Sequence, residues 1–315
     1  MSTKKTKPTK ASLNRREALR AQKAAEARRQ KRNRIIVISV AVVVLVVIVS
    51  LVAWLIVRNQ PQPTPRPTPS GNQVIPPDGD DQHAWITVPS ANTKAGALIV
   101  DVQFDYQCPY CAKVENAYAV NFETLNSQGD IILRNHTRTF LDNRFQNNSS
   151  MKAAVAAACV DYADNTKYAA YHNLIFVNQP PSDKEGTGYT DDQLRNQFTS
   201  AVGLTGDALT TFQACYDQQQ TLQFVQDVEY NNAQPVANPS PPNNYLFGGN
   251  KPNADDAAGQ CTGTANAPIG VCGTPDFYVN GVEFTFGDLM NSDFSPKLTT
   301  VSQLLAFLQA RAAQS

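Results

Sequence analysis

A run of 23 uncharged residues divides this chain into two parts of opposite charge. Residues 35–57 read IIVISVAVVVLVVIVSLVAWLIV, in which only Ser39 and Ser50 are polar. As an α-helix at about 1.5 Å per residue the run is roughly 35 Å long, enough to cross a hydrocarbon core of about 30 Å. Cleaved secretory signals have shorter apolar runs and a small-residue cleavage site. We therefore interpret residues 35–57 as an uncleaved, single transmembrane helix.

The charges on either side of this run predict its orientation. Residues 1–34 hold 13 basic residues against two acidic ones, Glu17 and Glu26, whereas the rest of the chain holds 14 basic and 25 acidic residues. Basic flanks stay in the cytoplasm, so we expect a cytoplasmic N-terminus, a single pass through the cell membrane and an extracytoplasmic C-terminal part. The basic tail, residues 1–34, is then a topology signal that meets anionic membrane lipid, and not a nucleic-acid-binding segment.

Residues 58–82 are expected to form a linker. Within them, residues 60–82 read QPQPTPRPTPSGNQVIPPDGDDQ, and the closely spaced prolines favour an extended polyproline conformation without a core. About 20 such residues at about 3.1 Å each reach roughly 60 Å. The linker would therefore hold an outer domain, residues 83–315, away from the membrane.

The outer domain begins with a strand–helix–strand pattern. Residues 97–106 (ALIVDVQFDY) are apolar and β-branched, the chain from Cys108 onward repeats apolar positions at helical spacing, and residues 131–141 (IILRNHTRTFL) resume as a strand. This order predicts two parallel strands joined by a helical crossover, and hence an α/β fold. Residues from about 150 to 230 have a helical pattern, and a hairpin at Asn280-Gly281 and a helix over residues 298–313 close the chain.

Two cysteines lie three positions apart where the first of these strands gives way to the helix. Cys108 would stand at the helix N-terminus, where backbone N–H groups and the helix dipole stabilise a thiolate and lower the thiol pKa. Pro109 suits the first helical turn, and Cys111, one turn later, would be able to attack a mixed disulfide formed at Cys108. A zinc site that recruits Cys261 and Cys272, or an inert staple, is the alternative. The strand-to-helix position favours thiol–disulfide exchange.

The motif FDYQCPYC, residues 104–111, followed far downstream by GTPDFYVNG, residues 273–281, resembles the DsbA-like thiol–disulfide oxidoreductases, and more narrowly their membrane-anchored actinobacterial members. The resemblance covers roughly residues 97–313 and implies a thioredoxin-like fold with a helical subdomain inserted at about 150–230. It also implies that Cys108 is the exposed nucleophile and Cys111 the resolving thiol. Pro275 would be a cis-proline facing the pair, and backbone groups of Thr274 would bind the substrate.

All six cysteines lie in the outer domain, which on the oxidising side of a membrane favours disulfides. The resemblance implies a structural bridge between Cys159 and Cys215, because similar family members carry cysteines in these two helices. Cys261 and Cys272 would then pair beside Pro275, with a secondary redox role for Cys272 as the alternative.

Other residues near the motif receive a structural interpretation. Asp105, three positions before Cys108, is either a proton relay for Cys111 or, as we favour, a strand-end acceptor of backbone hydrogen bonds. His136 and His172 have no partner ligands in the pattern and are interpreted as structural or surface residues. Residues 231–270, rich in Asn, Pro, Gly and Ala, predict a long exposed loop that is functional or mobile.

These features predict a membrane-tethered enzyme that forms disulfides in unfolded secreted or cell-envelope proteins, with no cofactor beyond its cysteine pair. The resemblance implies reoxidation by a membrane quinone-linked partner of the vitamin K epoxide reductase or DsbB kind. Because the Pro109-Tyr110 dipeptide lacks a histidine, we expect a potential between roughly −120 and −230 mV. A reductase or isomerase is therefore an open alternative, as is a non-catalytic chaperone or binding module with the same fold.

Overall fold

The computed structural model describes most of the outer domain and part of the apolar run. The described residues are 29, 34, 38, 42, 44–52, 54, 67–80, 82, 85–145, 147–181, 188–233 and 274–314. The chain divides into two compact units, Met1–Gln62 and Pro63–Ser315. Most of the basic tail, residues 58–66 of the linker, and residues 234–273 with Cys261 and Cys272 lie outside the described residues, so the predicted Cys261–Cys272 bridge and most of the 231–270 loop do too.

The described residues of the first unit are helical, and from residue 38 onward all of them except Ser50 are apolar. Their large side chains are between 50 % and 64 % exposed; they are Ile38, Val42, Val44, Leu45, Val46, Val47, Ile48, Val49, Leu51, Val52 and Trp54. Among the described residues, no helix is both long and apolar enough to cross a membrane. Much of the span predicted over residues 35–57 lies outside them.

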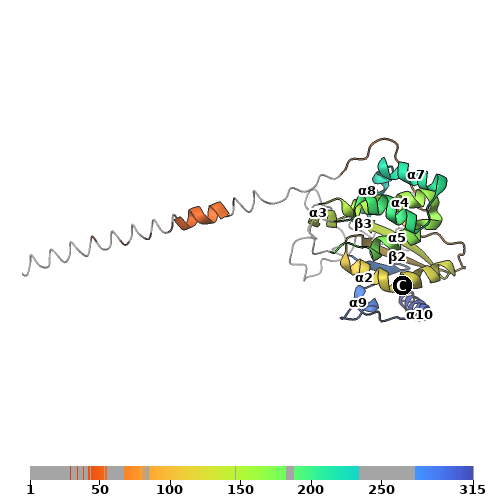
Figure 1. Cartoon of the computed structure of the whole chain (residues 1–315). Coiled ribbons are helices and arrows are strands. Elements are labelled where there is room, and N and C mark those ends of the chain that lie inside the picture. The colour runs from red at the N-terminus through yellow and green to blue at the C-terminus, as the bar shows by residue number, and fades with distance from the viewer. Residues whose placement is uncertain are drawn as a thin grey trace, which may run out of the picture. The chain divides into compact units, whose positions relative to one another are not determined.

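A five-stranded sheet forms the centre of the second unit (Figure 1). Its order is β1-β3-β2-β4-β5, with β1 at Ile86–Thr87, β2 at Leu98–Asp105, β3 at Ile131–Arg138, β4 at Asp276–Val279 and β5 at Val282–Phe284. Strands β2 and β3 are parallel, as predicted, and pair from Leu98↔Ile131 to Asp105↔Arg138, whereas the other pairs are antiparallel. Strand β2 is the central strand of the sheet, and its residues from Val100 to Asp105 are all buried.

Helix α2, Pro109–Ser127, makes the predicted crossover between β2 and β3. Its buried side chains recur at helical spacing and include Val114, Tyr118, Phe122 and Leu125. Gly129, with φ +77°, ends the helix in the left-handed conformation that glycine adopts without steric cost. The Gly129 N–H donates to the Asn126 carbonyl and the next N–H donates to the Leu125 carbonyl, both at 2.9 Å, which is a Schellman motif.

The helical insertion is present between β3 and β4. Its described elements are α3 (Leu141–Phe145), α4 (Ser149–Asp164), η1 (Asn165–Lys167), α5 (Tyr168–Val177), the π-helical turn η2 (Gln193–Gln197), α6 (Phe198–Ala201), α7 (Gly206–Asp217) and α8 (Leu222–Ala233). Figure 1 shows α4, α7 and α8 gathered together. Cys159 of α4 is disulfide-bonded to Cys215 of α7, which is the pairing that the resemblance implied. A closed loop with a sequence separation of 56 residues stabilises a fold by roughly 4 kcal/mol in the chain-entropy model.

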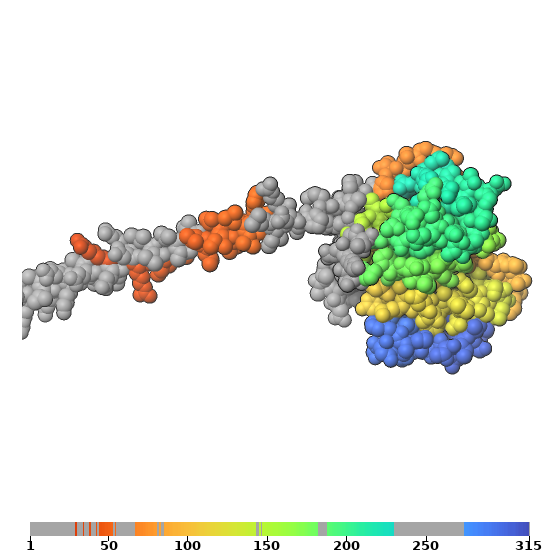
Figure 2. Space-filling model, viewed as in Figure 1, coloured from red at the N-terminus to blue at the C-terminus, as the bar shows by residue number. Residues whose placement is uncertain are grey.

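The C-terminal elements follow the predicted pattern. Asn280 and Gly281, with φ of 46° and 81°, form the tight turn between β4 and β5. After α9, Phe286–Leu289, the closing helix α10, Val301–Ala312, buries Leu304 and Leu308. Figure 2 shows this C-terminal segment, in blue, packed against the yellow region that contains α2.

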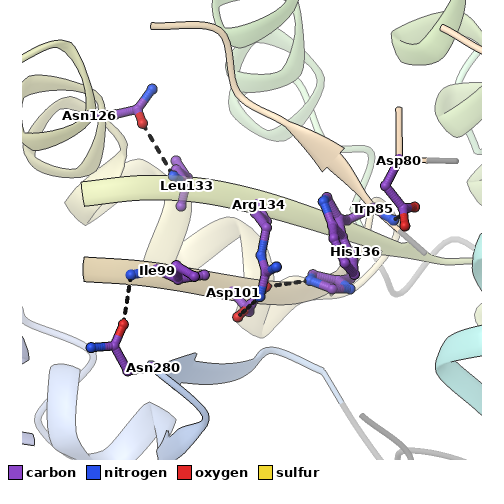
Figure 3. Close-up of polar contacts among 9 residues, drawn as sticks. All are labelled: Asp80, Trp85, Ile99, Asp101, Asn126, Leu133, Arg134, His136 and Asn280. Carbon is purple, nitrogen blue, oxygen red and sulfur yellow. Dashed lines mark hydrogen bonds and ion pairs between the residues drawn. The ribbon is translucent and has the colours of Figure 1, made fainter. Parts of the chain in front are cut away.

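A buried cluster of charges joins β2 to β3 (Figure 3). Arg134 donates to both carboxylate oxygens of Asp101, at 2.6 and 2.7 Å, and His136 Nε2 lies 2.7 Å from Asp101 Oδ1. The ring of Trp85 covers the Arg134 guanidinium at 4.2 Å. Burial acts to raise the pKa of Asp101, but the hydrogen bonds from His136 and Arg134 outweigh it and hold that pKa below its usual value. His136 is therefore a structural residue and not a surface one.

The C-terminal end of the predicted linker packs onto the helical subdomain. We call residues 67–80 the strap. The Val74 N–H donates to the Gln220 carbonyl at 2.8 Å, and the Gln226 side chain donates to the Pro67 carbonyl at 2.8 Å. Part of the segment predicted as a linker, residues 67–80, therefore packs against the domain, because the Val74 N–H and the Pro67 carbonyl find partners at the α7–α8 turn and on α8.

The end of the strap brings two carboxylates together. The Asp78 N–H donates to Asp161 Oδ2 at 3.2 Å, and Asn165 donates to the Asp78 carboxylate at 2.8 Å. Asp161 is fully buried on α4. Burial, followed by the nearby charge of Asp78, raises the pKa of Asp161 to about 8. In the folded protein Asp161 therefore keeps its proton through the acidic range and at neutral pH.

This raised pKa makes the stability of the wild type fall as pH rises from about 4 to about 8, because the folded state binds the proton more tightly than the unfolded state. The slope from this residue is at most about 1.4 kcal/mol per pH unit. Asp161→Asn removes this titrating group and its pH dependence. We therefore expect the free energy of unfolding of the variant to increase relative to that of the wild type as pH rises through this window. Denaturant unfolding at several pH values measures the difference. The exposed Asp207→Asn is the control, and parallel curves for Asp161→Asn and the wild type would contradict the prediction.

Candidate active site

The paired cysteines lie where β2 ends and α2 begins. Cys108 is the N-cap residue of α2, with φ −78° and ψ 117°, and Pro109 is the first helical residue. The Cys108 N–H donates to the Asp105 carbonyl at 2.9 Å, and the Cys108 carbonyl accepts the first helical bond, from Ala112 N–H, at 3.1 Å. Both Cys108 and Cys111 are free thiols. The predicted strand-to-helix position of the pair is confirmed.

A segment 166 residues beyond Cys108 in the chain also lies at the cysteine pair. The Thr274–Pro275 peptide bond is cis and leads directly into β4, which pairs with β2. Cys108 Sγ donates to the Thr274 carbonyl oxygen at 3.1 Å, across a sequence separation of 166 residues. The fold thus brings Thr274 and Pro275 to the cysteine pair, as the resemblance implied.

Cys108 is an acidic thiol. A hydrogen bond from the Cys111 side chain is the largest cause that lowers its pKa, burial opposes it, and the Thr274 side chain and the N–H groups of Cys111 and Tyr110 lower it further. The resulting pKa is about 6 against an ordinary value of 9.0. The sequence predicted a lowering from the helix N-terminus, and the structure adds the Cys111 thiol as the main donor.

Cys111 has the opposite character. It is only 2 % exposed. Burial, and then the hydrogen bond and charge of Cys108, raise the pKa of Cys111 well above its ordinary value. One sulfur is therefore an anion at neutral pH while its neighbour keeps its proton, and this difference separates a nucleophile from a resolving thiol.

Cys108 is less accessible than the resemblance implied. The residue is 5 % exposed, so the expectation of an exposed nucleophile is wrong for this structure. The physical reason is that its sulfur faces the Thr274 carbonyl, whereas Tyr110 is the side chain of the motif that faces solvent, at 50 % exposure.

Tyr110 belongs to an aromatic cluster that sequence reasoning missed. Its ring lies edge-on to Phe286 at 5.5 Å and tilted to Phe294 at 5.9 Å, and the Lys113 ammonium lies 4.1 Å from the Phe294 ring. Phe294 is 40 % exposed and has φ +65°, which is rare for a bulky residue. No sequence signal reveals this cluster, because its members come from three separate segments.

Asp105 is a strand-end acceptor, which is the interpretation we favoured over a proton relay. Its carboxyl group accepts from the N–H of Gln107 at 2.8 Å, the N–H of Leu141 at 3.1 Å and the hydroxyl of Ser150 at 2.5 Å. Burial, followed by the nearby Asp142, raises its pKa well above the usual range.

Tyr106 anchors the turn before the motif. Its buried hydroxyl lies 2.9 Å from His172 Nδ1, and His172 Nε2 lies 3.1 Å from Glu115 Oε1 on α2. The backbone carbonyl of Tyr106 accepts a hydrogen bond from the Tyr189 hydroxyl at 2.9 Å. His172 is therefore structural, and the helical subdomain holds the β2–α2 turn through side chains far from it in sequence.

Metal binding finds no support in the part of the chain that the structure describes, where no group of three or more His, Cys, Asp and Glu residues is arranged to hold an ion. Cys261 and Cys272, which the zinc alternative needs as ligands, lie outside the described residues.

Comparison with known proteins agrees with this fold. Residues 92–239 match a family model described as Thioredoxin. No curated protein matches the chain. Among solved structures, the MdbA thiol–disulfide oxidoreductase of Actinomyces oris is 17% identical, with a TM-score of 0.50 over 79% of this chain and 96% of that chain. MdbA of Corynebacterium diphtheriae is 16% identical, with a TM-score of 0.47 over 75% and 95%. Reduced DsbA of Mycobacterium tuberculosis is 18% identical, with a TM-score of 0.44 over 73% and 98%.

The second unit is thus a thioredoxin-like α/β domain with a helical insertion, and its fold places an acidic thiol beside a second cysteine. The predicted thioredoxin-like fold is confirmed, because MdbA of Actinomyces oris has the same fold over 79% of this chain. Together the fold and the paired thiols support an oxidoreductase.

The pKa of about 6 makes the reactivity of Cys108 testable. In the reduced protein, alkylation of Cys108 by iodoacetamide should reach half its maximal rate near pH 6, because only the thiolate reacts. Cys111→Ala removes the main hydrogen-bond donor and should move this midpoint upward. Mass spectrometry of the alkylated peptide over a pH series measures both. A wild-type midpoint near 9, as for an ordinary thiol, would contradict the prediction.

Proposed function

We propose that this chain is an extracytoplasmic dithiol oxidase, which forms disulfides in secreted or cell-envelope proteins through Cys108 and Cys111. The observation that carries the proposal is the opposite shift of the two thiol pKa values. An acidic thiol is a good leaving group, so a Cys108–Cys111 disulfide is readily reduced and hence oxidising toward other thiols. This chemistry needs no bound cofactor.

The transfer has two balanced steps. A client thiolate attacks Cys108 Sγ of the enzyme disulfide, which forms a mixed disulfide and releases Cys111 as a thiolate that takes up a proton. A second client thiolate then attacks the client sulfur of the mixed disulfide, which forms the client disulfide and releases the Cys108 thiolate. The client loses two electrons and the enzyme gains them.

Reoxidation of the two thiols needs a two-electron acceptor. We propose a membrane quinone-linked thiol oxidase, of the vitamin K epoxide reductase or DsbB kind. It would pass the electron pair to a quinone and restore the Cys108–Cys111 bond. The resemblance supports this class of partner, and a membrane-tethered enzyme would meet it in the same bilayer.

A binding module with a dormant cysteine pair is the second candidate. The burial of Cys108 favours it, since an inaccessible sulfur exchanges slowly. The exposed ring of Tyr110 beside the motif would then serve to bind unfolded chains as a chaperone does. A reductase or isomerase differs from the oxidase only in potential, and titration against glutathione separates them.

Disulfide transfer tests the proposed reaction. Oxidised full-length protein mixed with a reduced, unfolded two-cysteine client should yield close to one client disulfide per enzyme, measured by mass spectrometry after acid quenching. Cys108→Ala should abolish transfer. The double variant Cys159→Ala/Cys215→Ala, which lacks only the structural bridge, is the matched control and should retain transfer. Absence of any transfer by the wild type would reject the oxidase and leave the binding module.

We also propose that residues 35–57 anchor the enzyme in the cell membrane, with the N-terminus in the cytoplasm. The support is the 23-residue uncharged run, the basic flank before it, and the exposure of its described apolar side chains by half or more. A contiguous apolar surface of this kind is unfavourable in water and suits contact with lipid.

Charged substitutions within the run test the anchor. Val44→Asp together with Val47→Asp should move the protein out of the membrane fraction, because a charge near the bilayer centre costs about 2.5–3.5 kcal/mol or more. Ser70→Asp, in the strap, is the control and should stay membrane-bound. Protease added to intact cells stripped of their wall should digest the outer domain of the wild type. A protected outer domain would contradict the orientation.

A further inference from the structure

Gln179 lies just beyond the end of α5 and reaches the reactive turn from the helical subdomain. Its side-chain Nε2 donates to the Tyr106 carbonyl at 2.8 Å and to the Cys108 carbonyl at 3.0 Å. A primary amide nitrogen carries two hydrogens, so each carbonyl can take one. A single side chain, 71 residues away from Cys108 in sequence, therefore bridges two alternate peptide groups of the turn.

These two bonds add to the hydrogen bonds that already hold the peptide groups on either side of Cys108. The Cys108 N–H is already held by the Asp105 carbonyl at 2.9 Å, and the Cys108 carbonyl accepts from Ala112 N–H at 3.1 Å. The Cys108 carbonyl thus has two donors, the Ala112 N–H and the Gln179 amide. The Tyr106 carbonyl also has two, the Gln179 amide and the Tyr189 hydroxyl. The orientation of the first turn of α2 thus depends on a contact from outside the strand and the helix.

The orientation of this turn decides what the sulfur of Cys108 meets. The N–H groups of Tyr110 and Cys111, in the first turn of α2, lower the pKa of Cys108, and the Thr274 carbonyl lies 3.1 Å from its sulfur. A rotation of the peptide group after Cys108 would change both the direction of these N–H groups and the distance to Thr274. Backbone donors at a helix N-terminus stabilise an anion only while they point at it.

We propose that Gln179 is a positioning residue for thiol–disulfide exchange: its amide holds the β2–α2 turn so that the Cys108 sulfur stays over the N-terminus of α2 and against Thr274. The inference rests on the proposed function and assigns the helical insertion a part in the reaction. The Gln179 amide donates to two backbone carbonyls, so it acts through the backbone of the turn.

Two variants remove the bridge in different ways. Gln179→Met keeps the length of the side chain and removes the donors, and Gln179→Ala also removes the packing. Asn178→Ala is the matched control, because this neighbouring amide donates only to the Leu174 carbonyl, at 2.8 Å. Tyr189→Phe removes the hydroxyl that bonds the Tyr106 and Ile175 carbonyls and leaves both Gln179 bonds in place, so it tests whether the Tyr106 carbonyl needs its second donor.

Three measurements on the full-length protein decide the proposal: the equilibrium constant with glutathione, the pH midpoint of Cys108 alkylation, and the melting temperature. Gln179→Met should shift the equilibrium constant three- to tenfold toward the enzyme disulfide, since a less stabilised thiolate is a poorer leaving group. Its alkylation midpoint should rise, and Asn178→Ala should change neither quantity. Tyr189→Phe should have a smaller effect than Gln179→Met.

A lower melting temperature with an unchanged equilibrium constant and midpoint would overturn the proposal and leave Gln179 a purely structural role. An equal shift in Asn178→Ala would overturn it too. If Gln179→Ala does not fold, Gln179→Met gives the result. Failure of the proposed function is distinct: the wild type would then transfer no disulfide to a client, while the alkylation midpoints would still show whether Gln179 positions the thiol.

Discussion

The central position of β2 is the constraint on which the site depends. Its parallel pairing with β3 requires a crossover, and α2 provides it, so the helix must begin where β2 ends. Its antiparallel pairing with β4 brings the segment after Pro275 alongside the same strand. The two pairings of β2 thus place Cys108 at the N-terminus of α2 and Thr274 next to the sulfur of Cys108. The chemistry of the pair follows from this arrangement of the sheet.

Burial affects the titratable groups of the domain in different ways according to their partners. Asp101 has Arg134 and His136 against it and stays ionised, whereas Asp161 has another carboxylate nearby and keeps its proton. The two cysteines repeat this contrast within one helical turn, because Cys111 donates a hydrogen bond and Cys108 receives it. The asymmetry of the pair is therefore produced by neighbours and not by a difference in residue type.

Much of the fold and of the site was predictable because its signals are local. The apolar strand over 98–105, the cysteine at its end and the Asn280-Gly281 turn each have a pattern of a few residues. Features formed by distant segments were not predictable. Strand β1 has two residues, too few for a periodicity, and the prolines of the strap indicate an extended chain but not what it docks against. The burial of Cys108 and the reach of Gln179 depend on tertiary contacts, and a glutamine at the end of a helix carries no signal for such a contact.

The docking of the strap has a mechanical consequence. Tension in the chain before Pro67 enters the domain at the α7–α8 turn and α8, through the carbonyl of Gln220 and the side chain of Gln226. That turn follows Cys215, which the disulfide to Cys159 ties covalently to α4. A pull on the linker therefore first loads the contacts between the strap and these cross-linked helices.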